Sequence, residues 1–298
     1  MQAILAFGPD PASLMCERIP VPRPGAGEVL VAVHATAVTA GELTWPERWP
    51  VVPAHDVAGV VAQLGDGVDT LSVGDDVYGL IPFDLPGAAA EFVAVPSTAL
   101  AAKPTAVDHL AAATLALGGL TARQALADHA CLEEGQHVLV HGGAGGVGTY
   151  VVQLAAFHGA TVTATASAAD TGFLIGLGAH AVIDCATRFE EQIGDVDIVV
   201  DTVGGDVMAR SWEVLRPGGI LIGVADDPSA QDARADVRAT YFVVEPRHEQ
   251  LSELAHLVDL GVLRPTVGGV FPLAETASAI ISQRDAHIRG KLAIRVVA

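Results

Sequence analysis

Cysteine is scarce in this chain of 298 residues, which contains only Cys16, Cys131 and Cys185. The three cysteines lie far apart in the sequence and form no C-x-x-C pair. Disulfide frameworks and structural zinc sites both need several cysteines, so we expect neither in this protein. We expect each cysteine to be a small buried hydrophobic residue.

Long apolar runs are also missing, since no uninterrupted stretch reaches the ~18–20 residues that a membrane span needs. The segment Met1–Gly8 has neither a basic start nor a long apolar stretch, so we predict no signal peptide and a cytoplasmic protein. Basic residues are few as well, because 16 Lys and Arg stand against 35 Asp and Glu, a formal net charge of -19. This balance opposes binding to nucleic acid, which depends on Lys and Arg that neutralise phosphates.

Glycine is abundant, and its most informative cluster lies in the run Val138–Gly148, where an apolar strand leads into a glycine-rich turn. The turn fits the pattern G-x-G-x-x-G and opens an apolar helix at Tyr150–His158. Between a strand and a helix, this pattern is typical of sites where bare backbone and a helix N-terminus bind a dinucleotide pyrophosphate. The alternative is a glycine-rich turn without a ligand. The predicted phosphate-binding residues are Gly142, Gly143, Ala144, Gly145, Gly146, Val147 and Gly148.

The first hundred residues favour a β-rich domain. Short apolar or alternating runs between Gly and Pro residues are typical of a small barrel or sandwich. The predicted strands are Gln2–Phe7, Leu14–Ile19, Glu28–Val38, Val57–Leu64 and Ala88–Val95, with a turn into a further strand at Gly74–Gly79.

From Gly135 onward, strands alternate with helices, which predicts βαβ units and a parallel sheet. The predicted strands are His137–His141, Thr161–Ala166, Ala181–Asp184, Ile198–Asp201, Ile220–Val224 and Ala239–Val244. The predicted helices are Gly146–His158, Ala169–Leu177, Phe189–Ile193, Val207–Leu215 and His248–Leu260, with an earlier helical stretch over Asp108–Ala130 interrupted at Gly118-Gly119. Arg216–Gly219 is expected to end a helix and turn, and the tail to form a helix (Leu273–Gln283) and a strand (Lys291–Val297).

Motifs along nearly the whole chain resemble the zinc-free branch of the medium-chain dehydrogenase/reductases, the quinone oxidoreductase-like proteins. The resemblance rests on the order of many short segments rather than on any one of them. They are Pro22–Val31, Asp56–Val61, Val73–Gly79, Leu120–Ala122, His141–Gly148, Leu177–Ala179, Asp201–Gly205, Leu215–Gly219 and Arg289–Lys291.

The resemblance implies an α/β fold with a GroES-like β-rich catalytic domain and a Rossmann domain with a doubly wound parallel sheet. We assign residues 1–107 and 263–298 to the GroES-like domain and residues 108–262 to the Rossmann domain. The family likeness also implies an active site in the cleft between the domains and a homodimer.

Zinc-using relatives place a Cys where this chain has Thr39, and a Gly-His-Glu segment where it has Ala54, His55 and Asp56. Catalytic zinc normally has three protein ligands, and the resemblance leaves only His55 as a candidate. We therefore predict no metal site, with His55 held by local hydrogen bonds, and a structural role for His141 beside the glycine turn.

The zinc-free relatives reduce quinones, enones or similar electron-poor double bonds with hydride from a nicotinamide. We assign Thr39, Trp45 and His55 to the substrate pocket, where Thr39 can hydrogen-bond a substrate oxygen and the flat ring of Trp45 can form a wall. For Thr39 and Trp45 a packing role is the alternative. The segment Thr39–Glu42 departs from the Asn-Pro and following Asp of many relatives, which leaves the substrate class open, and we identify no general acid.

The choice of nicotinamide depends on the second strand of the parallel sheet. Its end, Thr165–Ser167, lacks the acid that binds the ribose 2′-OH of NAD in many sites, and Ser167 can donate to a 2′-phosphate. Arg188 is the nearest basic candidate by sequence. Asp170 either caps the next helix together with Ser167 or binds the ribose. We predict NADPH, with NADH as the alternative.

Further cofactor positions come from the resemblance alone. It places Thr121 near the nicotinamide, Val203 and Val224 beside the adenosine and the nicotinamide ribose, Phe242 and Val243 at the carboxamide, and Lys291 at the phosphates, where an ordinary solvated lysine is the alternative. The leading hypothesis is a zinc-independent, NADPH-dependent reductase of quinones or α,β-unsaturated carbonyls, a class of small-molecule substrates. The alternatives are a zinc-type alcohol dehydrogenase with atypical ligands and an NADPH-binding protein without turnover.

Overall fold

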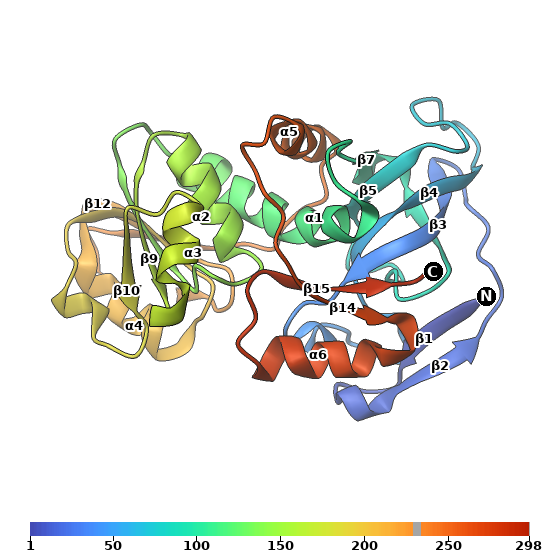
Figure 1. Cartoon of the computed structure of the whole chain (residues 1–298), viewed down its shortest axis with the longest axis horizontal. Helices are drawn as coiled ribbons and strands as arrows, with labels where there is room; N and C mark the ends of the chain where they lie inside the picture. Colours follow the sequence, from blue (N-terminus) through green and yellow to red (C-terminus); the bar gives the residue numbers. More distant parts are fainter. Residues whose placement is uncertain (229–233, 298) are drawn as a thin grey trace. The chain divides into compact units, whose positions relative to one another are not determined.

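The computed structural model describes residues 1–228 and 234–297, which form two compact units (Figure 1). The β-rich unit contains Met1–Leu120 and the chain from Glu245 onward, and the α/β unit contains Thr121–Val244. In these described ranges, no helix is both long enough and apolar enough to cross a membrane.

A mostly antiparallel sheet forms the frame of the β-rich unit, in the strand order β14-β15-β3-β4-β5-β7. One edge of β3 pairs with β4, while the other pairs with β6 over residues 28–32 and with β15 over residues 35–37. Buried valines of β3 build the core on one face. The strands are β1 (Gln2–Ala6), β2 (Leu14–Arg18), β3 (Glu28–Ala37), β4 (Asp56–Leu64), β5 (Asp76–Leu80), β6 (Phe92–Pro96), β7 (Leu100–Ala102), β14 (Val267–Pro272) and β15 (Lys291–Arg295).

Helices of the β-rich unit come from both ends of its sequence. The Tyr78 hydroxyl of β5 donates to the Leu251 carbonyl of α5 at 2.6 Å, and the His248 ring lies 2.6 Å from the Leu100 carbonyl oxygen. These buried contacts fix α5 on the β-rich unit, whereas the sequence suggested a boundary after residue 262. The helices are α1 (His109–Arg123), α5 (His248–Asp259), α6 (Thr276–Asp285) and the short η1 (Pro11–Ser13), η2 (Glu42–Thr44), η3 (Ser97–Ala99) and η8 (Leu273–Glu275).

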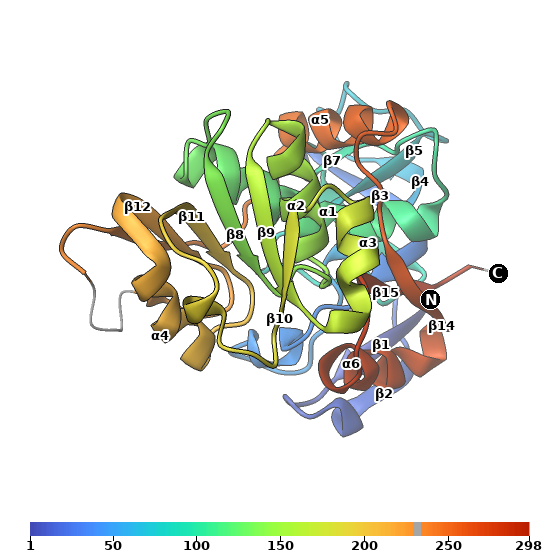
Figure 2. The same cartoon turned by 60° about the vertical axis from the view of Figure 1, so that its left-hand side comes forward.

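The α/β unit contains one six-stranded sheet in the order β10-β9-β8-β11-β12-β13, and every pair is parallel. The chain starts in the centre at β8 and winds outward in both directions, so right-handed crossovers place α2 and α3 on one face and α4 on the other. In Figure 2, α3 lies to the right of β8, β9 and β10, and α4 lies to their left. This topology confirms the predicted doubly wound parallel sheet.

The bounds of the elements in the α/β unit agree closely with several predicted ones. The strands are β8 (His137–His141), β9 (Thr161–Ala166), β10 (Ala181–Asp184), β11 (Val196–Asp201), β12 (Leu215–Gly223) and β13 (Arg238–Tyr241). The helices are α2 (Gly148–Phe157), α3 (Thr171–Gly176), α4 (Gly205–Val214), the π-helix η4 (Gln124–His129) and the short η5 (Ala168–Asp170) and η6 (Phe189–Glu191).

Three expectations about local structure are wrong. The Gly118-Gly119 pair does not interrupt α1. Gly119 has a packing role instead, because the Leu254 side chain lies 3.1 Å from the position that a Cβ of residue 119 would take. Arg216–Gly219 lies within β12 and forms an irregular part of this strand. The pairing register of β12 with β11 shifts there, between residues 196 and 198 of β11. All three cysteines are exposed, because Cys16 lies on the two-stranded sheet β1-β2 and the other two follow in loops.

Candidate active site

The glycine-rich turn joins β8 to α2 at the carboxyl edge of the parallel sheet. Gly142 has φ +70°, a conformation that side chains rarely adopt. A Cβ at Gly143 would lie 2.7 Å from the Ala164 Cβ, and one at Gly148 would collide with the Gly142 carbonyl oxygen. These positions therefore require glycine, and the turn presents bare backbone.

The amides of this turn are only partly used inside the unit. The Gly143 N–H donates to the Thr165 carbonyl at 3.0 Å, and the Gly145 N–H donates to the Gly142 carbonyl at 3.0 Å. Within the described ranges, the N–H groups of Ala144, Gly146 and Val147 have no acceptor, and no side chain caps α2. Free amides at the positive end of a helix fit a pyrophosphate, so the observed backbone is compatible with a bound dinucleotide.

The neighbouring strand β11 ends beside the same turn. The buried Asp201 carboxylate accepts the Val203 N–H at 2.8 Å and the Gly204 N–H at 3.1 Å, while burial raises its pKa and these amides oppose the rise. A Cβ on Gly142 would lie 3.1 Å from the Val203 side chain, and the Val224 N–H donates to the Asp201 carbonyl at 3.0 Å. The structure thus places Val203 against the glycine turn and Val224 beside the end of β11.

The end of β9 shows how Ser167 and Asp170 are used. The Ser167 hydroxyl accepts the Ala169 N–H at 3.3 Å and so caps the short helix η5. Asp170 has no exposed surface, which favours its structural role over binding of a ribose. Ser167 itself is half-buried, and its hydroxyl hydrogen stays available to a phosphate oxygen.

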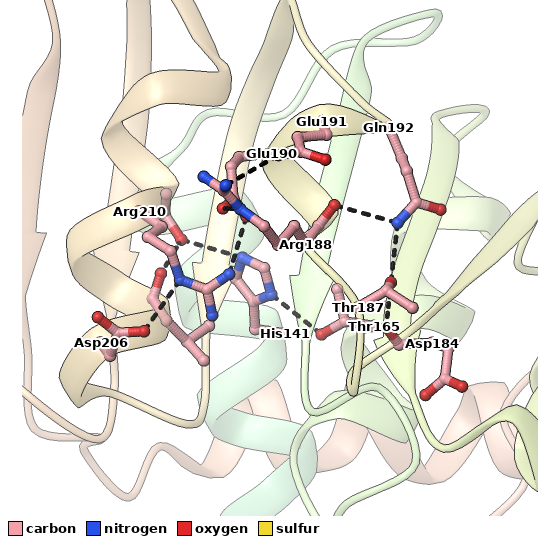
Figure 3. A network of polar contacts seen from close by, with 12 residues as sticks. His141, Thr165, Asp184, Thr187, Arg188, Glu190, Glu191, Gln192, Asp206 and Arg210 are labelled. Carbon is pink, nitrogen blue, oxygen red and sulfur yellow. Dashed lines mark hydrogen bonds and ion pairs between the residues drawn. The ribbon is translucent and has the colours of Figure 1, made fainter.

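Arg188 follows β10, and its guanidinium is paired within the unit (Figure 3). Nε donates to Glu190 at 2.9 Å, and a second nitrogen lies 2.9 Å from Glu191. Glu190 also pairs with Arg210 at 2.8 Å. Binding of a 2′-phosphate by Arg188 would compete with these carboxylates, so its cofactor role stays a prediction.

His141 lies at the end of β8 in the same network (Figure 3) and has no exposed surface. Its Nε2 lies 3.0 Å from the Ser211 hydroxyl, which itself donates to the Val207 carbonyl at 2.8 Å, so Nε2 bears the hydrogen. Nδ1 then accepts from the Thr165 hydroxyl at 3.0 Å. Burial, with a smaller effect of the Arg210 charge, lowers the pKa of His141 to about 3. Both nitrogens of this neutral ring are used, as expected of a structural histidine.

The remaining cofactor candidates of the α/β unit are scattered. Thr121 is 5% exposed, Val243 is 57% exposed, and the Phe242 ring lies 4.3 Å from the His129 ring. Their roles at the nicotinamide therefore stay predictions.

In the β-rich unit, a buried polar cluster joins residues from the two ends of the chain. The Lys291 ammonium donates to the Thr39 hydroxyl at 2.9 Å and forms an ion pair with Asp56. The other Asp56 oxygen accepts the Leu117 N–H at 2.6 Å. Lys291 is 3% exposed and Asp56 is fully buried. The alternative that Lys291 is an ordinary solvated lysine is therefore wrong. The phosphate role of Lys291 has no contact to support it.

Glu42, which the sequence analysis did not single out, completes this cluster from the short helix η2. Its Oε2 accepts the Thr39 N–H at 3.3 Å, and the residue is 4% exposed. Burial raises the pKa of Glu42 to about 8, although Lys291 and the Thr39 amide oppose the rise. The sequence feature that could have pointed to Glu42 is its position three residues after Thr39, in the segment that departs from the relatives' pattern.

Beside the cluster lies a pocket of about 500 Å³ within the β-rich unit. Its walls are mainly apolar and rich in proline, and its polar side chains are Glu28, Glu42, His55 and Asp84. Two of the lining residues are His55 and Phe83. The centre of the Phe83 ring lies 5.1 Å from that of the His55 ring and 5.2 Å from that of the Trp45 ring. Burial lowers the pKa of His55 to about 4, so this ring is neutral near pH 7.

The residues at this site do not fit a catalytic zinc ion. Residue 39 is a threonine, and Asp56 is committed to Lys291 and the Leu117 amide. Across residues 1–228 and 234–297, no three His, Cys, Asp or Glu residues are grouped so that they could hold a metal ion. The single imidazole of His55 falls short of the three protein ligands that catalytic zinc takes.

Comparisons with known proteins place this architecture in a family. Residues 25–105 match the model of the alcohol dehydrogenase GroES-like domain, and residues 177–294 match the model described as zinc-binding dehydrogenase. The chain is 32% identical to a probable zinc-binding mitochondrial oxidoreductase of Arthroderma benhamiae, over 96% of this chain and 93% of that protein. It is 30% identical to a chloroplast envelope quinone oxidoreductase homolog of Arabidopsis thaliana, over 97% and 96%.

A solved structure agrees with these relatives. The quinone oxidoreductase from Coxiella burnetii superposes with a TM-score of 0.92 at 31% identity and covers 100% of this chain and 99% of that one. The chain is also 32% identical to an NADPH-dependent alkenal/one oxidoreductase of Arabidopsis thaliana, over 82% of this chain and 64% of that protein. Fold and site thus define a nicotinamide-dependent oxidoreductase. The chain belongs to the quinone oxidoreductase-like members of the medium-chain dehydrogenase/reductase family.

Proposed function

We propose that this protein is a zinc-independent, NADPH-dependent oxidoreductase that reduces quinones or α,β-unsaturated carbonyls. The observation that supports it most is the glycine turn, whose free amides at the start of α2 suit a pyrophosphate. The pocket of about 500 Å³ supports a small, largely apolar substrate, because apolar walls with few polar groups are typical of such sites.

When bound, a reduced nicotinamide supplies a hydride to an electron-poor carbon of the acceptor. The protein binds and orients the reactants and excludes water. Because Lys291 donates to Thr39 Oγ1, the Thr39 hydroxyl hydrogen is directed elsewhere and can donate to a substrate carbonyl oxygen. The Trp45 and Phe83 rings offer flat apolar surface to a quinone or enone.

The preference for NADPH rests on the end of β9. No exposed acid stands there to bind a ribose 2′-OH or to repel a 2′-phosphate, since Asp170 is fully buried. Ser167 can donate to the phosphate, and one relative is named as NADPH-dependent. The homodimer that the family likeness implies and the predicted cytoplasmic location stay predictions.

The first test is a titration of the purified protein with NADPH and NADH, followed by nicotinamide fluorescence. We expect much tighter binding of NADPH. Tighter binding of NADH would contradict the cofactor assignment. Binding of NADPH without oxidation by any quinone or enone would instead favour a binding protein without turnover, and binding of neither nucleotide would contradict the proposed function.

A further inference from the structure

We propose that Glu42 is the proton donor of the reaction and transfers its carboxyl proton to the oxygen of the acceptor. The proposal rests on the proposed function and adds the general acid that the sequence did not reveal. It follows from the position of Glu42 at the border between the buried cluster and the pocket of the β-rich unit.

The two carboxyl oxygens of Glu42 differ in their surroundings. Oε2 accepts the Thr39 N–H at 3.3 Å. Oε1 is fully buried and has no hydrogen-bond partner among the described residues, although the residue lines the pocket. A buried carboxylate oxygen without a donor is costly, whereas a carboxyl O–H at this place needs only an acceptor. The carbonyl oxygen of a quinone or enone is such an acceptor.

Burial, more than the charges that face Glu42, keeps its proton in place before the reaction. Lys291 on β15 approaches from one side, but its charge is balanced by Asp56 on β4. The other charged or titratable groups of the pocket lining are His55, which is neutral near pH 7, the acids Glu28 and Asp84, and the Met1 ammonium, which donates to the Ile19 carbonyl at 2.9 Å. Burial therefore dominates and raises the pKa of Glu42 to about 8, close to the range in which an acid donates efficiently at neutral pH.

With an enone as acceptor, the proton transfer accompanies addition of a hydride to carbon. The β-carbon gains a hydride with its two electrons. The π pair of the C=C bond forms a new double bond between the α-carbon and the carbonyl carbon, and the π pair of the C=O bond moves to the oxygen. That oxygen takes the Glu42 proton, so an O–H bond forms as the carboxyl O–H bond breaks. The enol then becomes the saturated ketone through exchange with solvent, and the carboxylate takes one proton from water. One hydride and one proton are consumed for each acceptor.

The same cluster stabilises Glu42 after the transfer. The Thr39 amide already donates to Oε2, and the Lys291 ammonium attracts the new negative charge.

The test compares Glu42→Gln with Glu47→Gln, the same change at an exposed acid that also lies between β3 and β4 but does not line the pocket. Glutamine keeps the size and a donor but cannot transfer a proton. We expect kcat for quinone or enone reduction to fall by about 10²–10³ in Glu42→Gln, with NADPH binding unchanged, and no change in Glu47→Gln. Glu42→Asp, which keeps the acid, recovers part of the rate.

A readout without turnover is the infrared spectrum of the protein alone. We expect a carbonyl band of a protonated carboxyl group at pH 6 that disappears as the pH rises through about 8 and that is absent from Glu42→Gln. Full activity of a folded Glu42→Gln, or no such band in the wild type, would overturn the proposal. If the band is present but the wild type reduces no acceptor, the proposed function is wrong, whereas the finding that Glu42 is protonated remains valid.

Discussion

The two units build their sites from different parts of the polypeptide. The α/β unit offers backbone amides to a ligand, while its buried polar side chains hydrogen-bond to one another. His141, for example, bonds to both Thr165 and Ser211. The β-rich unit presents side chains, and its buried acid Glu42 keeps an oxygen without a partner among the described residues. The first arrangement suits a ligand bound through its phosphates, because backbone amides are available whatever the side chains are. The second suits a reaction step that depends on particular side chains.

The largest expected effect tests the buried pair of the β-rich unit. Replacing Lys291 by Met leaves the Asp56 carboxylate buried without its cation, and we expect the free energy of unfolding to fall by about 3–5 kcal/mol. Urea denaturation measures this loss. The double variant Lys291→Met/Asp56→Asn removes both charges and is expected to recover most of it. Equal instability of the single and double variants would contradict the pairing.

The next effect tests the backbone site of the α/β unit. A Cβ at Gly148 would collide with the Gly142 carbonyl oxygen, so Gly148→Ala is expected to distort the turn and weaken NADPH binding at least ~100-fold, or about 2.7 kcal/mol. The control is Gly172→Ala in α3, where a Cβ meets nothing within 4 Å. Unchanged affinity in Gly148→Ala would show that the turn does not bind the cofactor.

Titration sharpens the comparison because the two buried groups act with opposite sign. The folded state lowers the pKa of His141 from 6.5 to about 3, so its contribution is lost as the pH falls from 6.5 toward 3. It raises the pKa of Glu42 from 4.5 to about 8, so that contribution is lost as the pH rises from 4.5 toward 8.

Each group contributes a slope of up to about 1.4 kcal/mol per pH unit to the free energy of unfolding within its window. Chemical denaturation across pH 4–9 is expected to show a smaller acid-side loss in His141→Asn and a smaller alkaline-side loss in Glu42→Gln. Parallel curves for wild type and either variant would mean that the replaced group does not titrate as described.

The smallest effects concern the 2′-phosphate. Arg188 is exposed and paired with Glu190 and Glu191, so Arg188→Ala is expected to weaken NADPH binding by less than about threefold, as is usual for a surface charge. Ser167→Asp places a carboxylate where the phosphate is expected and should reverse the preference toward NADH. Fluorescence titration of both variants with both nucleotides measures these changes. A tenfold loss in Arg188→Ala would place its guanidinium at the phosphate.

The sequence predicted the α/β unit well because its signals are local. A strand, a glycine turn and a helix follow one another within about twenty residues, and the spacing of Gly143, Gly145 and Gly148 reflects steric demands of that short segment. The burial of the cysteines was predicted wrongly, because it depends on what packs over β2 and over the two loops that contain Cys131 and Cys185.

The polar cluster could be predicted only in part. Thr39, Trp45 and His55 were expected in a pocket, and Phe83 joins the last two of them. Lys291 reaches Thr39 across 252 positions of sequence through the pairing of β15 with β3, which no local pattern reveals. The proton of Glu42 follows from its burial, which is likewise a property of the folded chain.

Zinc-independent reduction is tested most directly with 1,4-benzoquinone and a short-chain enone, which the purified protein reduces with NADPH before and after exhaustive treatment with a chelator. We expect NADPH to be oxidised in a one-to-one ratio with the acceptor and the rate to be the same after chelation. Loss of activity on chelation with recovery by zinc, or no oxidation with either acceptor, would contradict it.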